Sequence, residues 1–204
     1  MASGIVQRSL YLPLFAIMLN LNFSPFPELT THRLHLRGIL PGDDERLFLL
    51  RTNDEAMRYL DRYSPKDLND VHAYIQTIED GIARNTAIVW AIALKEDPRL
   101  IGTIAFHQID KQNARAELGY MLMPEFWNKG LATEALQKII GVGFNQFGFH
   151  SMIANINPGN EASRKLLLKA GFVKEAYFRE DFYFNGRFID SEIYALLQSD
   201  PRDY

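Results

Sequence analysis

The chain has 204 residues, of which 47% are hydrophobic and 23% charged, a composition typical of one soluble globular domain with a sizeable core. Its net charge of −3 gives no general attraction for nucleic acid, so an anionic ligand would need a local site. The absence of cysteine excludes a disulfide framework and any thiol nucleophile, and it fits a cytoplasmic protein.

An apolar run, Leu10–Leu19, lies near the start of the chain and resembles the core of a signal peptide. It is too short to cross a bilayer, Pro13 interrupts it, and no small-residue cleavage site follows. Export is therefore the less favoured alternative. We expect residues 1–27 to be an extension that packs on the domain or arises from an early start codon, and residues 28–200 to form the domain.

The pattern of apolar residues then predicts alternating strands and helices. A strand is expected at His32–Gly38, where the apolar spacing is near two, and helices at Leu47–Leu60 and Asp67–Arg84. The next elements are strands at Ala87–Leu94, Leu100–Ile109 and Ala114–Met123, a helix over residues 131–147, a strand at Met152–Ile156 and a helix at Asn160–Ala170. Gly171 is placed to end that last helix in a left-handed conformation.

Two closing strands, Tyr177–Phe184 and Arg187–Leu196, flank Asn185-Gly186, which is the strongest short signal for a hairpin. This order of elements predicts a mixed α/β fold, in which a single sheet with helices on both faces buries all the apolar stripes.

The junction at Lys129-Gly130 is the first candidate for chemistry. Glycine lets a ligand approach the backbone closely, and the amides that open the following helix have no partner within it. Together with the helix dipole and Lys129 they would form an anion site. The alternative is a plain turn from strand to helix, and the junction by itself does not decide between the two.

The surrounding sequence, ELGYMLMPEFWNKGLATEAL at Glu117–Leu136, resembles the coenzyme A loop of GNAT acetyltransferases. The pattern of that loop is Gln/Arg-x-x-Gly-x-Gly/Ala, and Gly130 and Ala132 fill its last two fixed positions. Trp127 stands at the position of Gln or Arg, a departure found in the branch of the ribosomal-protein N-terminal acetyltransferases RimJ and RimL. THRLHLR at Thr31–Arg37 and ANINPGNEASRKLLLKAGF at Ala154–Phe172 agree with that branch. The resemblance implies a mostly antiparallel sheet of six to seven strands with splayed central strands.

The resemblance also implies positions for acetyl-CoA, the co-substrate. Backbone amides in the loop should hold its pyrophosphate, the strand end should pair with its pantetheine arm, and two asparagines should contact it. Asn160 could equally be the N-cap of its helix. The coenzyme-binding residues predicted in this way are Tyr120, Met121, Leu122, Lys129, Gly130, Leu131, Ala132, Thr133, Asn155 and Asn160.

The implied reaction is direct attack of an amine on the thioester. Glu117 is the predicted base, although it could be a solvated carboxylate paired with Arg115 or Lys111, and weak assistance suffices for an α-amine whose pKa is near 8. A backbone amide near Leu122 would stabilise the oxyanion. Many relatives carry a Tyr where this chain has Leu167, so Ser163 is the candidate acid, unless it is only a residue of the first helical turn.

The sequence does not determine which amine accepts the acetyl group. By analogy we expect a protein or peptide N-terminal amine, with a small amine or amino acid as an alternative. A catalytically silent coenzyme A sensor and a P-loop protein are weaker alternatives. Spacing typical of a metal site is absent, and nucleic acid and membrane are not expected as partners, whereas a homodimer is compatible with the pattern. An acidic cluster would suit a cationic acceptor: Asp54, Glu55, Asp61, Asp67 and Asp70.

Overall fold

The computed structural model describes residues 19–202, and the sheet that they form has eight strands. Seven of these strands correspond to the seven expected from the apolar spacing, and the eighth is a two-residue strand at its edge. The order across the sheet is β1-β2-β3-β4-β5-β6-β8-β7. The strands are β1 (Leu29–Thr30), β2 (Leu34–Arg37), β3 (Ile88–Leu94), β4 (Leu100–Asp110), β5 (Arg115–Leu122), β6 (Ser151–Ile156), β7 (Val173–Phe184) and β8 (Arg187–Leu197).

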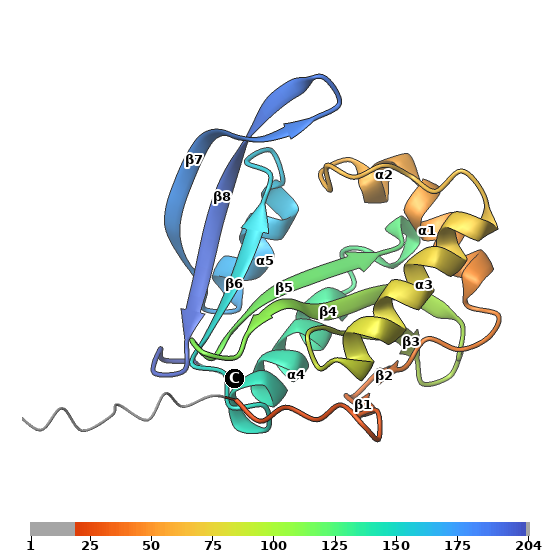
Figure 1. Cartoon of the computed structure of the whole chain (residues 1–204), viewed down its shortest axis with the longest axis horizontal. Helices are drawn as coiled ribbons and strands as arrows, with labels where there is room; N and C mark the ends of the chain where they lie inside the picture. Colours follow the sequence, from red (N-terminus) through yellow and green to blue (C-terminus); the bar gives the residue numbers. More distant parts are fainter. Residues whose placement is uncertain (1–18, 203–204) are drawn as a thin grey trace, which may run out of the picture.

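Helices cover both faces of the sheet, as the sequence predicts. Figure 1 shows α3 in front of the central strands and α4 behind them. The helices are α1 (Asp44–Thr52), α2 (Asp54–Met57), α3 (Leu68–Ala83), α4 (Leu131–Asn145) and α5 (Glu161–Lys169), with a short 3-10 turn at Pro124–Phe126. No helix between residues 19 and 202 is long and apolar enough to cross a membrane.

Side chains of β3 alternate between two buried clusters, which is why one strand can serve both faces. Trp90 and Ile92 pack in the larger cluster with α4 and α5, whereas Ala91 packs in the smaller one with α1 and α3. The indole of Trp90 is fully buried, and its Nε1–H donates to the carbonyl of Pro27 at 2.7 Å.

The described end of the predicted extension packs on the sheet. Leu21 and Phe23 are buried in the larger cluster. The run Leu10–Leu19 lies outside the described residues except for Leu19, and the boundary between residues 27 and 28, like the cytoplasmic location, stays a prediction.

The predicted helix Leu47–Leu60 is wrong, because the structure breaks it at Asn53. Asn53 has an extended backbone (φ −75°, ψ 117°), and its side chain accepts from the amide of Ala56 at 3.0 Å. This side chain therefore caps a new helix, α2, which has only four residues. After α2 the chain continues as a loop, residues 58–67, which we call the α2–α3 loop.

The strands β5 and β6 diverge, as the resemblance implied. Their parallel pairing runs only from Arg115 with Ser151 to Glu117 with Ile153, although both strands continue beyond it. Figure 1 shows the widening gap between them. Beyond Glu117, no other strand of residues 19–202 pairs with this edge of β5.

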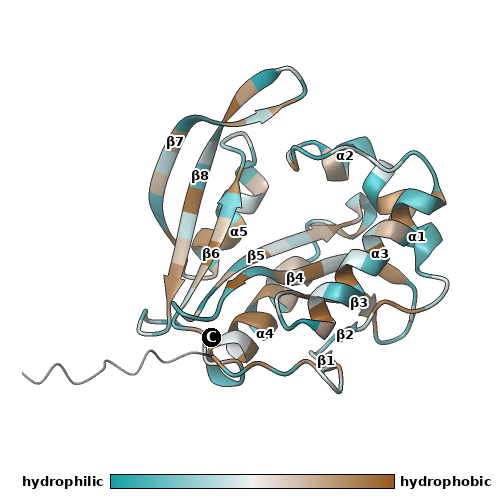
Figure 2. Ribbon diagram, viewed as in Figure 1, coloured by the Kyte–Doolittle hydropathy of each residue, from teal (hydrophilic) through white to brown (hydrophobic). Residues whose placement is uncertain are grey.

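The closing hairpin of β7 and β8 extends past the rest of the sheet (Figure 1). Asn185 and Gly186 both have positive φ (48° and 82°), and Phe184 pairs with Arg187, so the predicted two-residue turn is confirmed. Figure 2 shows runs of hydrophilic and of hydrophobic residues along both strands. The tip of the hairpin reaches the α2–α3 loop, where the ring of Phe184 lies 4.8 Å from that of Tyr63.

Candidate active site

A pocket of about 450 Å³ opens between the end of β5, the start of α4 and the start of α5. It brings together most of the residues that the coenzyme resemblance singles out, and residues of α2 and the α2–α3 loop close its remaining side. The predicted residues that line it are Tyr120, Met121, Leu122, Gly130, Leu131, Ala132, Thr133, Asn160 and Ser163.

The start of α4 presents free backbone donors to this pocket. Gly130 is its N-cap, with φ +74° in the left-handed region that favours glycine. The first hydrogen bond within the helix runs from Glu134 N to Gly130 O, so the amides of Leu131–Thr133 precede the regular bonding pattern. They can therefore serve an anion in the pocket.

Contacts with β2 hold this helix start in place. The Glu134 carboxylate accepts from the backbone amide of Arg33 at 2.7 Å, from its Nε at 2.8 Å and from the hydroxyl of Thr31. Burial opposes the charge of Glu134, but these bonds outweigh it and lower its pKa. Arg33 also donates to the carbonyl of Lys129 at 2.9 Å, which fixes the loop just before Gly130.

Lys129 and Trp127 have different surroundings from those that the sequence suggests. Lys129 is exposed, its Nζ lies 5.4 Å from the centre of the Phe126 ring, and it is not among the residues that line the pocket. Trp127 does line the pocket, and its Nε1–H donates to the carbonyl of Leu122 at 2.7 Å. The indole thus ties the loop to the strand end.

The free edge of β5 faces the gap between the splayed strands. The amide of Met123 donates to Ile101 on the β4 side. Because hydrogen-bonding directions alternate along a strand, Tyr120 and Leu122 direct their amides and carbonyls away from β4, and of these the Leu122 carbonyl is already bonded to Trp127. An extended ligand could pair there as an added strand would.

The start of α5 supplies a hydroxyl, that of Ser163, which meets a phenol from β5 in the wall of the pocket. Asn160 is the N-cap, and its Oδ1 accepts from the amide of Ser163 at 3.0 Å, so the capping role of Asn160 is observed. The Ser163 hydroxyl is buried and lies 2.5 Å from the phenol of Tyr120. Burial raises the pKa of Tyr120 to about 12, against a smaller lowering by Ser163.

Sequence reasoning missed this phenol. It looked for a Tyr on the helix at Leu167, which is fully buried in the core. The phenol comes instead from β5 and meets Ser163 across the gap. Alternation along β5 could have indicated that Tyr120 points toward α5, but the partner on α5 could not be read from local sequence.

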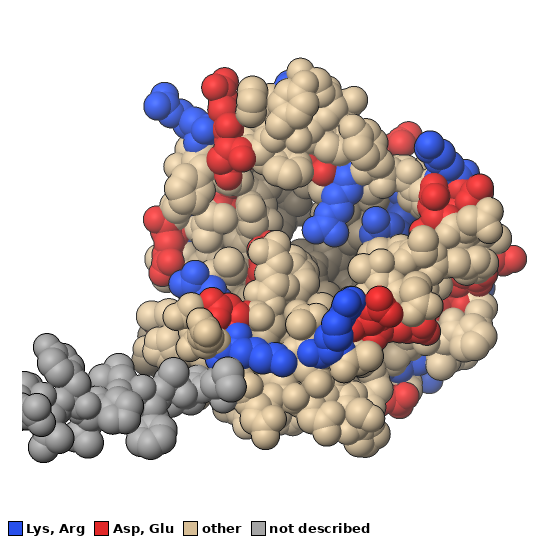
Figure 3. All heavy atoms as spheres, viewed as in Figure 1, with Lys and Arg blue, Asp and Glu red and all other residues tan. Residues whose placement is uncertain are grey.

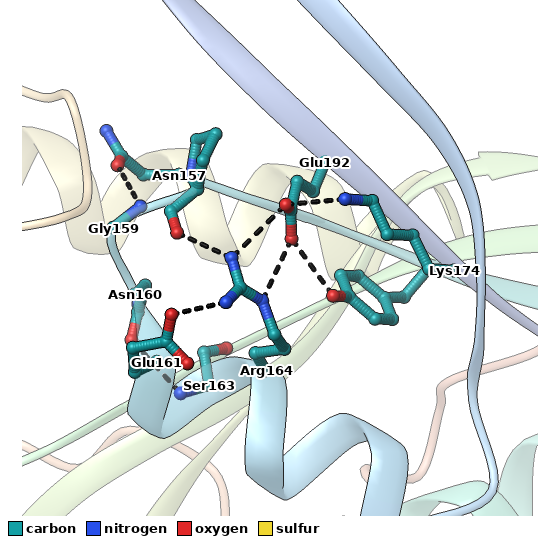
Figure 4. Close-up of polar contacts among 10 residues, drawn as sticks. Asn157, Gly159, Asn160, Glu161, Ser163, Arg164, Lys174 and Glu192 are labelled. Atoms are coloured by element: carbon teal, nitrogen blue, oxygen red, sulfur yellow. Dashed lines mark hydrogen bonds and ion pairs between the residues drawn. The ribbon is translucent and has the colours of Figure 1, made fainter.

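A buried carboxylate on β8 anchors the turn before α5 (Figure 4). Glu192 is 3% exposed and accepts from Arg164 at 3.2 Å, Lys174 at 2.6 Å and Tyr194 at 2.9 Å. Burial opposes its charge, but these donors outweigh burial and lower its pKa. Arg164 also donates to the carbonyl of Pro158 at 2.7 Å, which connects the carboxylate to the turn that carries Asn160.

Glu117 lies on the other face of β5, at the point where the splay begins. It sits opposite His107 of β4, and neither of these two residues lines the pocket at the start of α4. Burial raises the pKa of Glu117, while the charge of Arg62 opposes that rise. Burial lowers the pKa of His107 to about 4, and Arg62 lowers it further, so the imidazole is neutral near pH 7. Glu117 is therefore the group on this face that is suited to accept a proton.

Asn155 is separated from the other predicted residues. Its neighbours Ala154 and Ile156 are buried in the larger cluster, whereas Asn155 is exposed and does not line the pocket. Alternation along β6 accounts for this position.

The α2–α3 loop crosses the end of the gap and touches the elements on its far side. The Tyr59 ring packs on Gly159, where an added Cβ would come within 3.1 Å of it. Asp61 accepts from the side chain of Asn157 at 3.2 Å, and the rings of Tyr63 and Phe184 are 4.8 Å apart. Figure 3 shows a hollow on this side of the molecule, with basic side chains toward α2.

Most of the predicted acidic cluster is bonded within the chain. Asp61 is held by Asn157, and Asp67 caps α3 by accepting from Asn69 and Asp70. The Asp70 carboxylate accepts from the amide of Lys66 at 2.8 Å. These bonds account for three of the five carboxylates without any cationic acceptor.

The splayed strands β5 and β6 thus open onto a helix start with free amides. The family model described as "Acetyltransferase (GNAT) domain" matches residues 33–173. The chain belongs to this family and is an N-acetyltransferase.

Named relatives agree with this assignment. The chain is 37% identical over 178 residues to "Uncharacterized N-acetyltransferase YoaA" of Bacillus subtilis (strain 168), which covers 87% of this chain and 99% of the relative. It is 30% identical over 167 residues to "Putative ribosomal N-acetyltransferase YdaF" of the same organism, covering 80% and 90%. Its fold is similar to that of spermidine N-acetyltransferase from Vibrio cholerae in complex with CoA and spermine, with TM-score 0.73, 23% identity and coverage of 82% and 96%.

Proposed function

We propose that the chain transfers an acetyl group from acetyl-CoA to a primary amine, most favourably the N-terminal amine of a protein or peptide. The observation that carries this proposal is that the free amides of α4 and the free edge of β5 open onto one pocket. Such a pocket suits a ligand with an anionic end and an extended amide chain, which is the shape of coenzyme A.

The residues present fit the coenzyme. The amides of Leu131–Thr133 would hold the pyrophosphate, supported by the positive end of the helix dipole. The strand end at Tyr120–Leu122 would pair with the pantetheine arm chiefly through the amide and carbonyl of Tyr120, since the Leu122 carbonyl is bonded to Trp127. The CoA named in the structure of the Vibrio cholerae enzyme, which has a similar fold, supports this placement. Lys129 would add a long-range charge rather than a direct contact.

The reaction balances without a covalent enzyme intermediate. The amine nitrogen attacks the thioester carbonyl carbon, the carbon–sulfur bond breaks, and the thiol of CoA leaves. Glu117 would take the proton from the nitrogen, directly or through water. The Leu122 amide, which points into the gap, would donate to the developing oxyanion. Ser163 would donate a proton to the departing sulfur and be resupplied by Tyr120, whose raised pKa keeps its phenol protonated.

The identity of the amine is the finer part of the proposal. The relation to a putative ribosomal N-acetyltransferase supports a peptide N-terminus, whereas the fold of a spermidine enzyme keeps a small amine as an alternative. A silent sensor of coenzyme A is disfavoured by the placement of Glu117 at the splay, where a sensor needs no base. A homodimer, paired through the closing hairpin or through the N-terminal extension, stays a prediction.

The test is release of CoA thiol from acetyl-CoA in the presence of N-terminal peptides, amino acids and polyamines, with the product mass measured. We expect thiol release that requires an amine, together with a mass gain of one acetyl group on that amine. Acetyl-CoA binding without thiol release across the whole panel would favour the sensor instead.

A further inference from the structure

Two guanidinium groups on the acceptor side of the splay form no ion pair with any carboxylate in residues 19–202. They are Arg51, on the last turn of α1, and Arg62, in the α2–α3 loop. We infer that these two arginines bind an anionic group of the acceptor, so that the enzyme selects amines that also carry a carboxylate. This inference rests on the proposed acetyl transfer and names its class of substrate.

Arg51 lines a second hollow, separate from the coenzyme-side pocket. This hollow, of about 610 Å³, lies between α1, the α2–α3 loop and α3, and Tyr63, Lys66, Asp70 and Tyr74 are also in its wall. Arg51 is half-buried, and its guanidinium carbon lies 4.1 Å from the centre of the Tyr74 ring. That contact orients the guanidinium but supplies no negative charge.

Arg62 is exposed in the α2–α3 loop, next to Tyr63, which is in the wall of this second hollow. Contacts of its two neighbours fix the loop at this point, since Asp61 is bonded to Asn157 and Tyr63 contacts Phe184. The charge of Arg62 acts on the pKa of Arg51 in the hollow and on those of Glu117 and His107 on β5 and β4. An anion bound by both arginines would therefore lie beside the amine that Glu117 serves.

The electrostatics of the second hollow favour an anion. Burial lowers the pKa of Arg51, and the like charge of Arg62 lowers it further, against an opposing effect of Tyr74. The like charges of Arg51 and Arg62 repel each other, and a bound anion would relieve the repulsion. Lys66 adds a third cation at the wall, against the single carboxylate of Asp70, which accepts from the Lys66 amide.

The chemistry of guanidinium specifies the ligand further. Its planar fork matches a carboxylate in a two-point hydrogen bond, which an ammonium of lysine cannot reproduce. The tyrosine walls leave room for the body of a peptide or amino acid. The same hollow would repel a polyamine, which carries only positive charge.

The experiment compares kcat/KM for matched acceptors that differ only in a carboxylate. The peptide arm uses Ser-Asp-Gln-Phe against Ser-Asn-Gln-Phe, both amidated at the C-terminus, the small-molecule arm uses β-alanine against its amide, and spermidine represents cationic acceptors. We expect the acidic member to be favoured about tenfold or more, chiefly through KM, because charged hydrogen bonds discriminate by that order. The arm with the larger preference separates a peptide from a small acceptor.

Variants assign the preference to the arginines. Arg62→Gln should remove most of it by raising KM for the acidic acceptor, Arg62→Lys should restore part of it, and Arg51→Gln should act in the same direction. Arg84→Gln is the matched control, since Arg84 is exposed and pairs only with Asp80. None of these variants should change the affinity for acetyl-CoA. A variant that was merely destabilised would lose this affinity as well.

The outcomes separate this inference from the proposed function. Equal rates on acidic and neutral acceptors, or a preference unchanged in Arg62→Gln, would overturn the arginine site while leaving acetyl transfer intact. Preference for spermidine would overturn it in favour of a cationic acceptor. Silence on every acceptor despite acetyl-CoA binding would contradict both.

Discussion

The two sides of the splay are built by different means. On the coenzyme side, the candidate donors are backbone amides at the start of α4 and along β5, positioned by one glycine and by hydrogen-bond alternation. On the acceptor side, the candidate contacts are side chains from α1, the α2–α3 loop and β5. A ligand that is the same throughout a family can be held by backbone, whereas a ligand that differs between members must be chosen by side chains.

This difference predicts how each side responds to mutation. Backbone donors survive most substitutions and fail only where the backbone itself cannot adopt its conformation. Side chains can be exchanged one at a time, with effects on acceptor choice or turnover and little effect on the coenzyme.

The largest effect is expected at the backbone of the coenzyme side. Gly130→Val should weaken acetyl-CoA binding by about a hundredfold or more, because a β-branched residue is strained at φ +74° and the following amides must shift. Calorimetric titration measures this loss. Gly141→Val is the matched control in the same helix, since nothing lies within 4 Å of a Cβ there, and it should bind normally. Retained affinity in Gly130→Val would show that the loop is only a turn.

The next effect concerns the predicted base on the acceptor side. Glu117→Gln should lower kcat about a hundredfold with an unchanged affinity for acetyl-CoA. Because burial raises the pKa of Glu117, kcat of the wild type should fall as pH drops through that raised value, and the variant should lose this dependence. Steady-state rates across pH measure it, with the exposed Glu79→Gln as control. An identical pH profile in both proteins would remove Glu117 as the base.

A smaller effect is expected where the two sides meet. Ser163→Ala and Tyr120→Phe should each lower kcat about tenfold, and the double variant should be no slower than either, because the hydroxyls act as one unit. The comparison uses rates at saturating acetyl-CoA and amine. Independent, multiplying losses would mean that the 2.5 Å contact is structural and carries no proton.

The smallest effect on turnover should come from the carboxylate that anchors α5. Glu192→Gln should lower the free energy of unfolding by about 2 kcal/mol, because it weakens charged bonds to Arg164 and Lys174. Since the pKa of Glu192 is lowered on folding, its contribution is present above the unfolded value near 4 and is lost as pH falls through the folded value. Denaturant unfolding at pH 7 and pH 3 should show the difference between variants shrinking at the lower pH.

An equal difference at both pH values would mean that the Glu192 contribution is one of packing. A large fall in kcat would mean that Glu192 also positions Ser163 for the reaction, although Glu192 does not line the pocket. Glu175→Gln on the neighbouring strand β7, where the side chain is exposed, is the control.

The features that the sequence predicts well are local ones. The Asn185-Gly186 turn, the left-handed Gly171 and the apolar face of α3 each depend on a few neighbouring residues, and the structure has all three. The resemblance at Glu117–Leu136 likewise covers one continuous stretch. These features suffice for the α/β class and the splay, whereas the coenzyme-binding role of the loop stays a prediction.

The features that the sequence does not predict depend on contacts between distant segments. Tyr120 meets Ser163 from 43 residues away, and Glu192 gathers donors from two other elements. The helix breaks at Asn53 because its side chain caps α2. Composition does not show whether an Asn side chain will cap a helix or face solvent. The charge of Arg62 acts on Glu117 because the α2–α3 loop crosses the gap, and the local sequence does not indicate that crossing.

The most direct test of the two-sided account is a crystal structure of the protein with CoA bound. The account predicts the pyrophosphate on the amides of Leu131–Thr133, the pantetheine arm along Tyr120 and Leu122, and the thiol near the Ser163 hydroxyl, with Glu117 on the opposite face left for the acceptor. A pyrophosphate bound elsewhere, with the amides at the start of α4 still open to solvent, would contradict it.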